Sequence, residues 1–210
     1  MSLKAQLEVC RREYEANAEP HVVDAARCSI QVLAETSLVA NAVKAGETAP
    51  LFGLRCGRGD FINLSGLLNR GPVVVSFLWG DWCPFCGLEL KALAAVHPEI
   101  ERLGATLVAL TPQARGRSSS LGSDTEPPFP ILQDTGCEIA ARYRIAFTVP
   151  QQFRAAYLAL GYPILRRPDR KVMYCRYRPR TSSIAAALSC FPTSTPIIPR
   201  GWSLLRLLPH

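Results

Sequence analysis

The feature that most constrains this chain is a pair of cysteines placed where a predicted strand gives way to a predicted helix. Cys83 and Cys86 follow the apolar, β-branched run 72–79 and open the helical stretch 84–103. The first N–H groups of a helix have no intrahelical partner and carry a partial positive charge, which stabilises a thiolate. Because the thiolate is the reactive form of cysteine and Cys-X-X-Cys motifs at such positions have lowered pKa values, the junction predicts a thiol redox site.

The sequence around this pair predicts a parallel strand–helix–strand unit. Residues 73–78 and 105–110 are short apolar runs, typical of strands buried on both faces. The helix between them is predicted to end at Gly104. Short loops in this order imply a right-handed crossover, with the site at the carboxyl end of the first strand. The helix is expected to bury an apolar stripe that consists of Leu88, Leu90, Leu93, Val96 and Ile100.

Further elements are expected on both sides of this unit. The first forty residues predict two amphipathic helices, the first capped by Ser2 and the second over 22–39. We interpret them as a helical appendage that packs on the domain, and a dimerisation arm is the alternative. The remaining predictions are a β-hairpin over 51–64, a helical turn over 65–69, a strand over 129–132, and helices over 134–143 and 149–160, with a last strand over 171–177.

Composition and cysteine spacing restrict the class of protein. The hydrophobic content of 48% and the charged content of 20% are globular values, and 210 residues suffice for one domain with appendages. The apolar runs are too short to cross a bilayer and the N-terminus lacks signal-peptide features, so we expect a cytoplasmic protein without a membrane partner. Only Cys83 and Cys86 of the eight cysteines stand at motif spacing, so we expect neither a metal nor another cofactor.

The net charge of +7 arises from one end of the chain. Up to Asp169 there are 17 basic and 17 acidic residues, whereas residues 170–210 contain 7 basic residues and no acid. An even basic face would suggest nucleic acid, but this tail lacks a binding motif and interleaved aromatic residues, so we expect no nucleic-acid partner. Because the charge composition changes abruptly after Asp169, we interpret residues 170–210 as a different kind of segment from the rest of the chain.

Several motifs around the cysteine pair resemble those of a known family. Trp82-Cys83-Pro84-Phe85-Cys86 after a buried strand resembles the active site of the thioredoxin superfamily. Residues 44–52 resemble the peroxiredoxin opening G-x-x-A-P-x-F, and residues 129–143 resemble its segment F-P-x-L-x-D…E-x-A-x-x-Y. Together these motifs cover residues 44–145. The chain is similar to the peroxiredoxin-like (alkyl hydroperoxide reductase/thiol-specific antioxidant) family, whose members carry W-C-P-x-C and a helical N-terminal extension.

The resemblance implies an architecture. We expect an α/β, thioredoxin-like fold in which helices flank a central mixed sheet, with a helical N-terminal extension and an irregular C-terminal tail. The expected divisions are the extension over 1–43, the thioredoxin-like peroxiredoxin domain over 44–169, and the acid-free tail over 170–210, either out of frame or disordered.

The resemblance also implies roles for the site residues, and it leaves two orders of attack open. In the peroxiredoxin pattern T-x-x-C-x-x-E, Cys86 would be the peroxidatic thiolate, Cys83 the resolving thiol, and Glu89 the residue that polarises or orients the site. Thioredoxin chemistry reverses the cysteines, so that Cys83 attacks and Cys86 resolves. Trp82 and Pro84 are expected to shield and shape the site. The alternatives are that Trp82 is a packing residue and that Glu89 is a charge favoured near a helix N-terminus.

The activity implied is a thiol-dependent peroxidase. It would reduce hydrogen peroxide or organic hydroperoxides and be recycled by thioredoxin or a similar dithiol donor, with a homodimer left open as its assembly state. Two alternatives stand beside it. One is a protein thiol-disulfide oxidoreductase, because Cys-X-X-Cys alone permits that chemistry. The other is an inactive, truncated or frameshifted remnant.

The chain departs from the family pattern at two places. Trp79 stands where peroxiredoxins have a proline, and the later family strand with its cis-proline has no counterpart after Leu160. Arg170 and Arg176 do not match the position of the family's active-site arginine, so that role is not transferred. Because the acid-free tail begins where the pattern stops, a shifted reading frame near the Tyr174 codon is one explanation. A genuine basic tail is the other.

Overall fold

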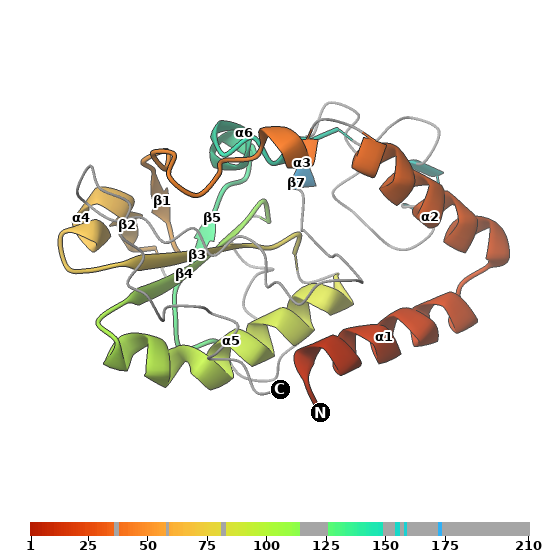
Figure 1. The fold of residues 1–210 in the computed structure, drawn as a ribbon, viewed down its shortest axis with the longest axis horizontal. Helices are drawn as coiled ribbons and strands as arrows, with labels where there is room; N and C mark the ends of the chain where they lie inside the picture. The colour runs from red at the N-terminus through yellow and green to blue at the C-terminus, as the bar shows by residue number, and fades with distance from the viewer. Residues whose placement is uncertain are drawn as a thin grey trace.

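A computed structural model of the chain describes residues 1–35, 38–57, 59–80, 83–113, 126–148, 154–155, 158 and 172–173, and all structural statements concern this part. Its centre is a parallel sheet with the strand order β3-β4-β5 (Figure 1). The strands are β3 (Val73–Phe77), β4 (Thr106–Thr111) and β5 (Ile131–Gln133). Helix α5 (Pro84–Arg102) lies between β3 and β4 in the chain, and the two strands pair in parallel. The predicted strand–helix–strand unit is therefore confirmed.

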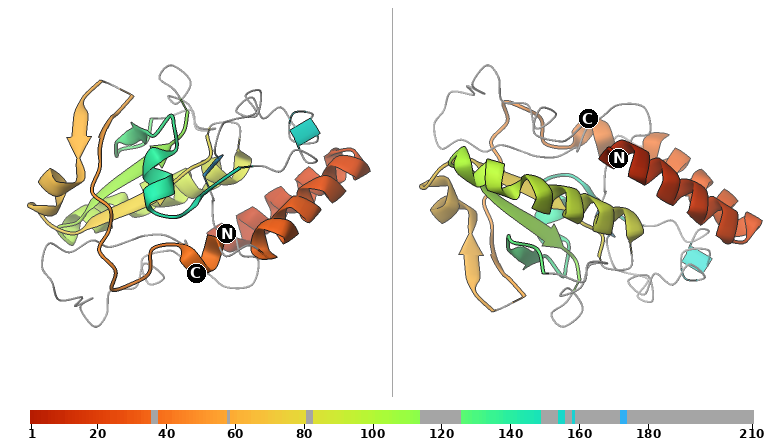
Figure 2. Two further views of the ribbon diagram at one scale, coloured as in Figure 1. Left: turned by 90° about the horizontal axis from the view of Figure 1, so that it is seen from above. Right: turned by 90° about the horizontal axis from the view of Figure 1, so that it is seen from below.

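Strand β3 is buried along its whole length because the sheet is covered on both faces. All five of its residues are buried. On one face Val74 belongs to a core cluster with Leu90 and Leu93 of α5, and Figure 2 shows α5 lying across the sheet. On the other face Val75 belongs to a second cluster with Tyr143. A continuous β-branched run suits a strand covered twice, which explains why no polar–apolar alternation marks it.

The buried stripe of α5 differs in one position from the sequence prediction. Leu88 is partly exposed, so its predicted place in the stripe is wrong. It lies two residues from Leu90, about 200° around an α-helix, and both side chains cannot face the sheet. The buried position one turn before Leu90 is Cys86. The other predicted positions are buried, namely Leu90, Leu93, Val96 and Ile100.

Short elements extend the sheet at the β5 side. Strands β1 (Gly53–Arg55) and β2 (Phe61–Asn63) form the predicted antiparallel hairpin, and helix α4 (Leu64–Leu68) follows it. An antiparallel bridge between Cys56 and Leu132 joins the hairpin to β5, which gives the mixed arrangement that was expected.

Helix α6 (Glu138–Arg142) follows β5 and is held at its first turn by a buried aspartate. The backbone N–H groups of Ile139 and Ala140 donate to the two carboxylate oxygens of Asp134, at 3.2 and 2.9 Å. An acidic side chain at this position satisfies otherwise unpaired N–H groups and complements the helix dipole. Beyond α6, strand β6 (Ala146–Phe147) pairs antiparallel with β7 (Val172–Met173), which lies inside the predicted strand 171–177. The predicted helix over 149–160 falls almost entirely outside the described residues.

Strand β3 is the outermost strand of the sheet as far as the described residues show. Within the described ranges, β3 has β4 as its single strand neighbour. The Cys83–Cys86 junction therefore lies at the carboxyl end of a strand that is paired on one side and packed on both faces.

The N-terminal extension consists of helices α1 (Leu3–Asn17), α2 (Pro20–Glu35) and α3 (Leu38–Asn41). Ser2 caps α1 as predicted, because its Oγ accepts the N–H of Ala5 at 3.3 Å. Helix α2 begins at Pro20, two residues earlier than predicted, since proline needs no partner for an N–H at the first helical position. Helices α1 and α2 form a V that opens toward the start of α5 (Figure 1), and α1 packs against α5. The prediction that the appendage packs on the domain is confirmed.

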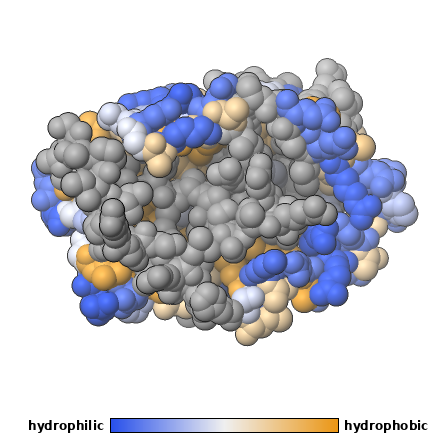
Figure 3. All heavy atoms as spheres, in the orientation of Figure 1, coloured by the Kyte–Doolittle hydropathy of each residue, from blue (hydrophilic) through white to orange (hydrophobic). Residues whose placement is uncertain are grey.

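On the face drawn in Figure 3, hydrophilic residues predominate at the right-hand side, where α1 and α2 meet, with hydrophobic residues among them toward the lower right. An ion pair joins the two helices, with Arg27 Nη2 3.0 Å from Glu15 Oε2. Among the helices in the described ranges, none has the length and apolar character that crossing a bilayer requires.

The two-sided core predicts unequal effects for two leucines of α5. Leu93 is fully buried, so Leu93→Ala leaves a cavity and is expected to lower the free energy of unfolding by about 2–5 kcal/mol. Leu88→Ala, on the same helix but partly exposed, is the matched control and is expected to cost about 1 kcal/mol or less. Urea unfolding followed by circular dichroism measures both. Equal losses would contradict this assignment of the buried face.

Candidate active site at the start of helix α5

The cysteine motif forms the first turn of α5. Cys83 is the N-cap residue with an extended backbone (φ −94°, ψ 109°), and Pro84 follows at the first helical position. The Cys83 carbonyl accepts the N–H groups of Cys86 at 3.1 Å and Gly87 at 3.3 Å. Proline fits there because its fixed φ matches the helix and it leaves no N–H unpaired. The local sequence thereby places both cysteines at the positive end of a 19-residue helix.

Both thiols are shielded from solvent. Cys86 is 0% exposed and Cys83 is 7% exposed, and both are free thiols. The backbone N–H of Trp79 donates to Cys86 Sγ at 3.3 Å. Trp79 lies just after β3, so this hydrogen bond fixes the Cys86 sulfur at the carboxyl end of the strand. A proline at position 79, as in the peroxiredoxin pattern, has no N–H and could not make it.

The neighbouring thiol controls the ionisation of Cys83. A hydrogen bond to the Cys86 side chain raises the pKa of Cys83 well above its ordinary value of 9.0. Burial raises this pKa further, and so does the charge that develops on Cys86. The backbone N–H groups of Cys86 and Phe85 act in the opposite direction. The net effect is a Cys83 pKa well above its ordinary value, which keeps the proton on the Cys83 sulfur.

Glu89 lies one turn beyond Cys86 and is tied to β3. Ser76 Oγ donates to Glu89 Oε1 at 3.0 Å. Cys83, Cys86 and Glu89 recur every three residues, so each is a neighbour of the next along the helix. Ser76 is buried, and the Glu89 carboxylate satisfies its hydroxyl. The bond links the strand and the helix that hold the two thiols.

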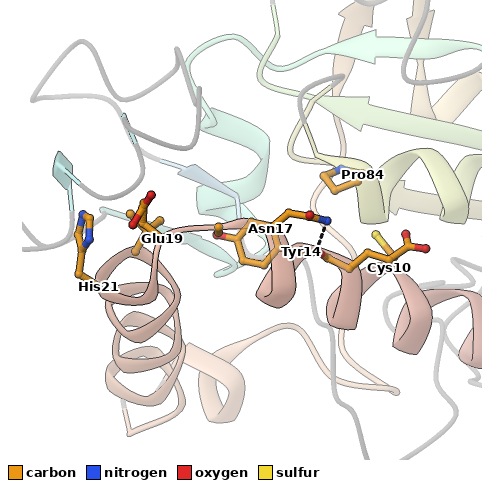
Figure 4. A pocket seen from close by; sticks show the side chains of 9 residues that line it. Cys10, Tyr14, Asn17, Glu19, His21 and Pro84 are labelled. Carbon is orange, nitrogen blue, oxygen red and sulfur yellow. Dashed lines mark hydrogen bonds between the residues drawn. The ribbon is translucent and has the colours of Figure 1, made fainter.

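The structure describes four of the five predicted site residues, all of them at the start of α5. Cys83, Cys86 and Glu89 follow one another along α5. Pro84 is exposed and faces a pocket lined by α1 and the start of α2 (Figure 4). Trp82 lies outside the described residues.

Sequence reasoning missed two contributors to the site. Ser76 carries a signal that could have revealed it, because a polar residue inside a strand predicted to be buried needs a partner. The Trp79 contribution comes from its backbone and leaves no trace in residue type. In the part of the chain that the structure describes, no group of three or more His, Cys, Asp or Glu side chains is arranged to hold a metal ion.

The raised pKa of Cys83 predicts a loss of stability at alkaline pH. The folded chain keeps a proton that the unfolded chain releases above about pH 9, so unfolding is favoured as pH rises past the unfolded pKa. The contribution is complete below that pKa and is lost toward the folded pKa, with a slope of at most about 1.4 kcal/mol per pH unit.

Urea unfolding between about pH 8 and pH 10 measures this slope. Cys83→Ser is expected to flatten it, whereas Cys28→Ser, which alters an exposed thiol on α2, should preserve it. The same slope in both variants would show that Cys83 does not hold the proton.

Several solved structures of thiol redox proteins are similar to part of the chain. The peroxidoxin BcpB of Mycobacterium tuberculosis is 24% identical with a TM-score of 0.45, and the match covers 50% of this chain and 68% of that one. The reduced 2-Cys peroxiredoxin of Plasmodium vivax is 19% identical, with a TM-score of 0.44 and coverage of 50% and 60%. A secreted Mycobacterium tuberculosis disulfide oxidoreductase homologous to DsbE of E. coli is 30% identical, with a TM-score of 0.39 and coverage of 48% and 70%.

Family membership follows from the sequence profile. No curated protein matches the chain significantly. The profile of the AhpC/TSA family, in contrast, matches residues 45–172 of the 210, from before the hairpin to strand β7. The matched region holds the βαβ unit and the thiol pair at its junction. The chain therefore has a thioredoxin-like fold and belongs to the AhpC/TSA family.

Proposed function

We propose that the chain is a thiol peroxidase in which Cys86 attacks the peroxide and Cys83 resolves the product. The observation that carries this proposal is the hydrogen bonding of the Cys86 sulfur, which accepts the Trp79 N–H at 3.3 Å and interacts with the Cys83 thiol. Both interactions favour a thiolate at Cys86, because donors directed at a charged sulfur stabilise it. The position of Cys86 in the first turn of α5 adds the helix dipole.

The proposed reaction has three steps. The Cys86 thiolate attacks the terminal peroxide oxygen, the O–O bond breaks, and the leaving alkoxide or hydroxide takes a proton to become an alcohol or water. Cys86 is then a sulfenic acid. The Cys83 sulfur attacks it, an S–S bond forms, and water leaves with the hydroxyl of the sulfenic acid and one proton. An external dithiol, thioredoxin or a similar protein, finally returns two electrons by disulfide exchange.

Protonation favours this order of attack over the thioredoxin order. If Cys83 attacked first, it would have to ionise against burial and against the neighbouring Cys86 sulfur, and both raise its pKa. Burial opposes the ionisation of both thiols, since Cys83 is 7% and Cys86 0% exposed, so the preference for Cys86 rests on the hydrogen bonds to its sulfur. In the proposed order, the Cys83 thiol can also give its proton to the hydroxyl that leaves the sulfenic acid as water when the disulfide forms.

Glu89 is proposed as a positioning residue. Its carboxylate accepts the Ser76 hydroxyl at 3.0 Å and so ties α5 to β3 one turn beyond Cys86. Loss of this bond would let the first turns of α5 move relative to Trp79, which supplies the N–H to the Cys86 sulfur. Small displacements of this kind are costly when catalysis depends on orientation.

A protein disulfide reductase is the second candidate, since Cys-X-X-Cys at a helix start also suits that activity. Peroxide consumption and insulin reduction, measured on the same preparation, separate the two. Activity in the insulin assay alone would favour the second candidate, and a purified chain without a cooperative thermal transition would favour the inactive remnant.

Serine variants of the cysteines test the order of attack. Cys86→Ser is expected to abolish peroxide turnover. Cys83→Ser should consume about one equivalent of peroxide per chain and then stop, because the sulfenic acid forms but is not resolved. Cys28→Ser, which alters an exposed thiol of α2 outside the site, is the control and should turn over normally. Full activity of Cys86→Ser would refute the assignment.

The role of Glu89 is tested by paired substitutions. Glu89→Gln keeps an acceptor for Ser76 and should retain most activity, whereas Glu89→Ala is expected to lower kcat about tenfold or more and shift the pH profile of the peroxide reaction. Glu99→Ala serves as the control, because Glu99 is on the same helix and pairs with Arg102 instead. Equal activities of Glu89→Ala and Glu99→Ala would show that Glu89 is a surface charge only.

A further inference from the structure

A pocket lies between the N-terminal extension and the start of α5, next to the redox motif. Its volume is about 590 Å³, within the range of ligand-binding pockets. One wall is Pro84, which follows Cys83 and is the first residue of α5. The other walls come from α1 and the beginning of α2 (Figure 4). Whatever occupies the pocket therefore contacts Pro84, the residue that follows Cys83 in the chain.

The pocket combines apolar walls with uncompensated negative charge. Tyr14, Val22 and Pro84 supply apolar surface. Glu13 and Glu19 supply two carboxylates, and within the described residues no ion pair engages either of them. Their neighbour Glu15 is instead neutralised by Arg11 and Arg27, at 3.9 and 3.0 Å.

The charge of Glu13 reaches the interior of the pocket. Cys10 lines the pocket one turn before Glu13 and Tyr14, and burial raises the pKa of its thiol, with the Glu13 carboxylate as the second cause. No lysine or arginine is among the lining residues of this pocket in the described chain, and His21 is its single ionisable nitrogen base. The electrostatics thus favour a cation.

We propose that this pocket receives a lysine- or arginine-bearing segment of the protein dithiol that recycles the Cys83–Cys86 disulfide. A long basic side chain fits both features, because its methylene stem can lie on apolar surface while its charged head meets the carboxylates. The aromatic ring of Tyr14 offers further attraction for a cation. A peroxide does not match the pocket, since hydrogen peroxide is small and neutral and the Cys86 sulfur is not part of the lining.

This proposal rests on the proposed function. It adds where the reductant binds and which charge its binding segment carries. A thiolate of the partner attacks one sulfur of the Cys83–Cys86 disulfide, the S–S bond breaks, and the released sulfur takes a proton. The second thiol of the partner then displaces the enzyme sulfur from the mixed disulfide. Two electrons pass to the enzyme, and the partner leaves as a disulfide. The pocket holds the partner against Pro84, next to Cys83 in the chain, during this exchange.

Cys10 allows the pocket to be probed without any activity. In the variant Cys83→Ser/Cys86→Ser, the Cys10 thiolate attacks a pyridyl-disulfide peptide and releases pyridinethione. Two six-residue probes are compared, one with two arginines and one with two glutamates. At low ionic strength the arginine probe is expected to modify Cys10 about fivefold or more faster than the glutamate probe, with rates read by peptide mass spectrometry.

Cys28 is the internal control for this experiment, because it is exposed on α2 and does not line the pocket. Its ratio of rates for the two probes should be smaller than that of Cys10. Glu13→Gln/Glu19→Gln should reduce the Cys10 ratio to that of Cys28. The control Glu8→Gln/Asp24→Asn removes two charges of α1 and α2 that do not line the pocket. It should preserve the Cys10 ratio of the parent. Equal ratios at Cys10 and Cys28 in the parent would overturn the proposal.

A second measurement links the pocket to recycling. The oxidised chain is reduced with Cys-X-X-Cys peptides that carry two arginines or two glutamates, and with dithiothreitol. Glu13→Gln/Glu19→Gln should slow reduction by the arginine peptide about fivefold and leave the dithiothreitol rate unchanged. An unchanged arginine-peptide rate would overturn the proposal. Failure of the peroxidase function itself would appear separately, as absence of peroxide turnover with dithiothreitol as the donor.

Discussion

The hydrogen bond from the Trp79 backbone to the Cys86 sulfur is the interaction on which the account of this site depends. It joins the end of β3 to the first turn of α5 and directs a fixed donor at one of two neighbouring thiols. The hydrogen bond to the Cys86 side chain and burial raise the pKa of Cys83. The proposed difference in role between two chemically identical side chains thus arises from their surroundings.

This interaction requires the elements around it to be rigid. Strand β3 is packed on both faces, and the Ser76–Glu89 hydrogen bond ties it to α5 a second time. The N-terminal extension meets the same junction from outside, because α1 packs on α5 and Pro84 closes the pocket that α1 and α2 line. The reactive thiols are therefore shielded by the domain, while the motif's proline faces the appendage.

Much of this architecture could be predicted from the sequence, and the failures have physical reasons. The β-branched run before Cys83 predicted β3, because a strand covered twice needs apolar residues at every position. Leu88 was misplaced because the prediction counted it as apolar without applying the helical period, which sets Leu88 and Leu90 about 200° apart. The Trp79 donor is a backbone group, and the pocket depends on how α1 and α2 fold back on α5. A local sequence pattern reveals neither the packing of segments that are distant in the chain nor the direction of a backbone N–H group.

The central claim, that Cys86 attacks and Cys83 resolves, is tested most directly by the intact mass of the chain after one equivalent of hydrogen peroxide. The account predicts that the parent loses about 2 Da as the disulfide forms, and that Cys83→Ser gains about 16 Da as a sulfenic acid. Cys86→Ser should remain unchanged. An oxygen gained by Cys86→Ser, with Cys83→Ser unchanged, would contradict the account and establish the reverse order.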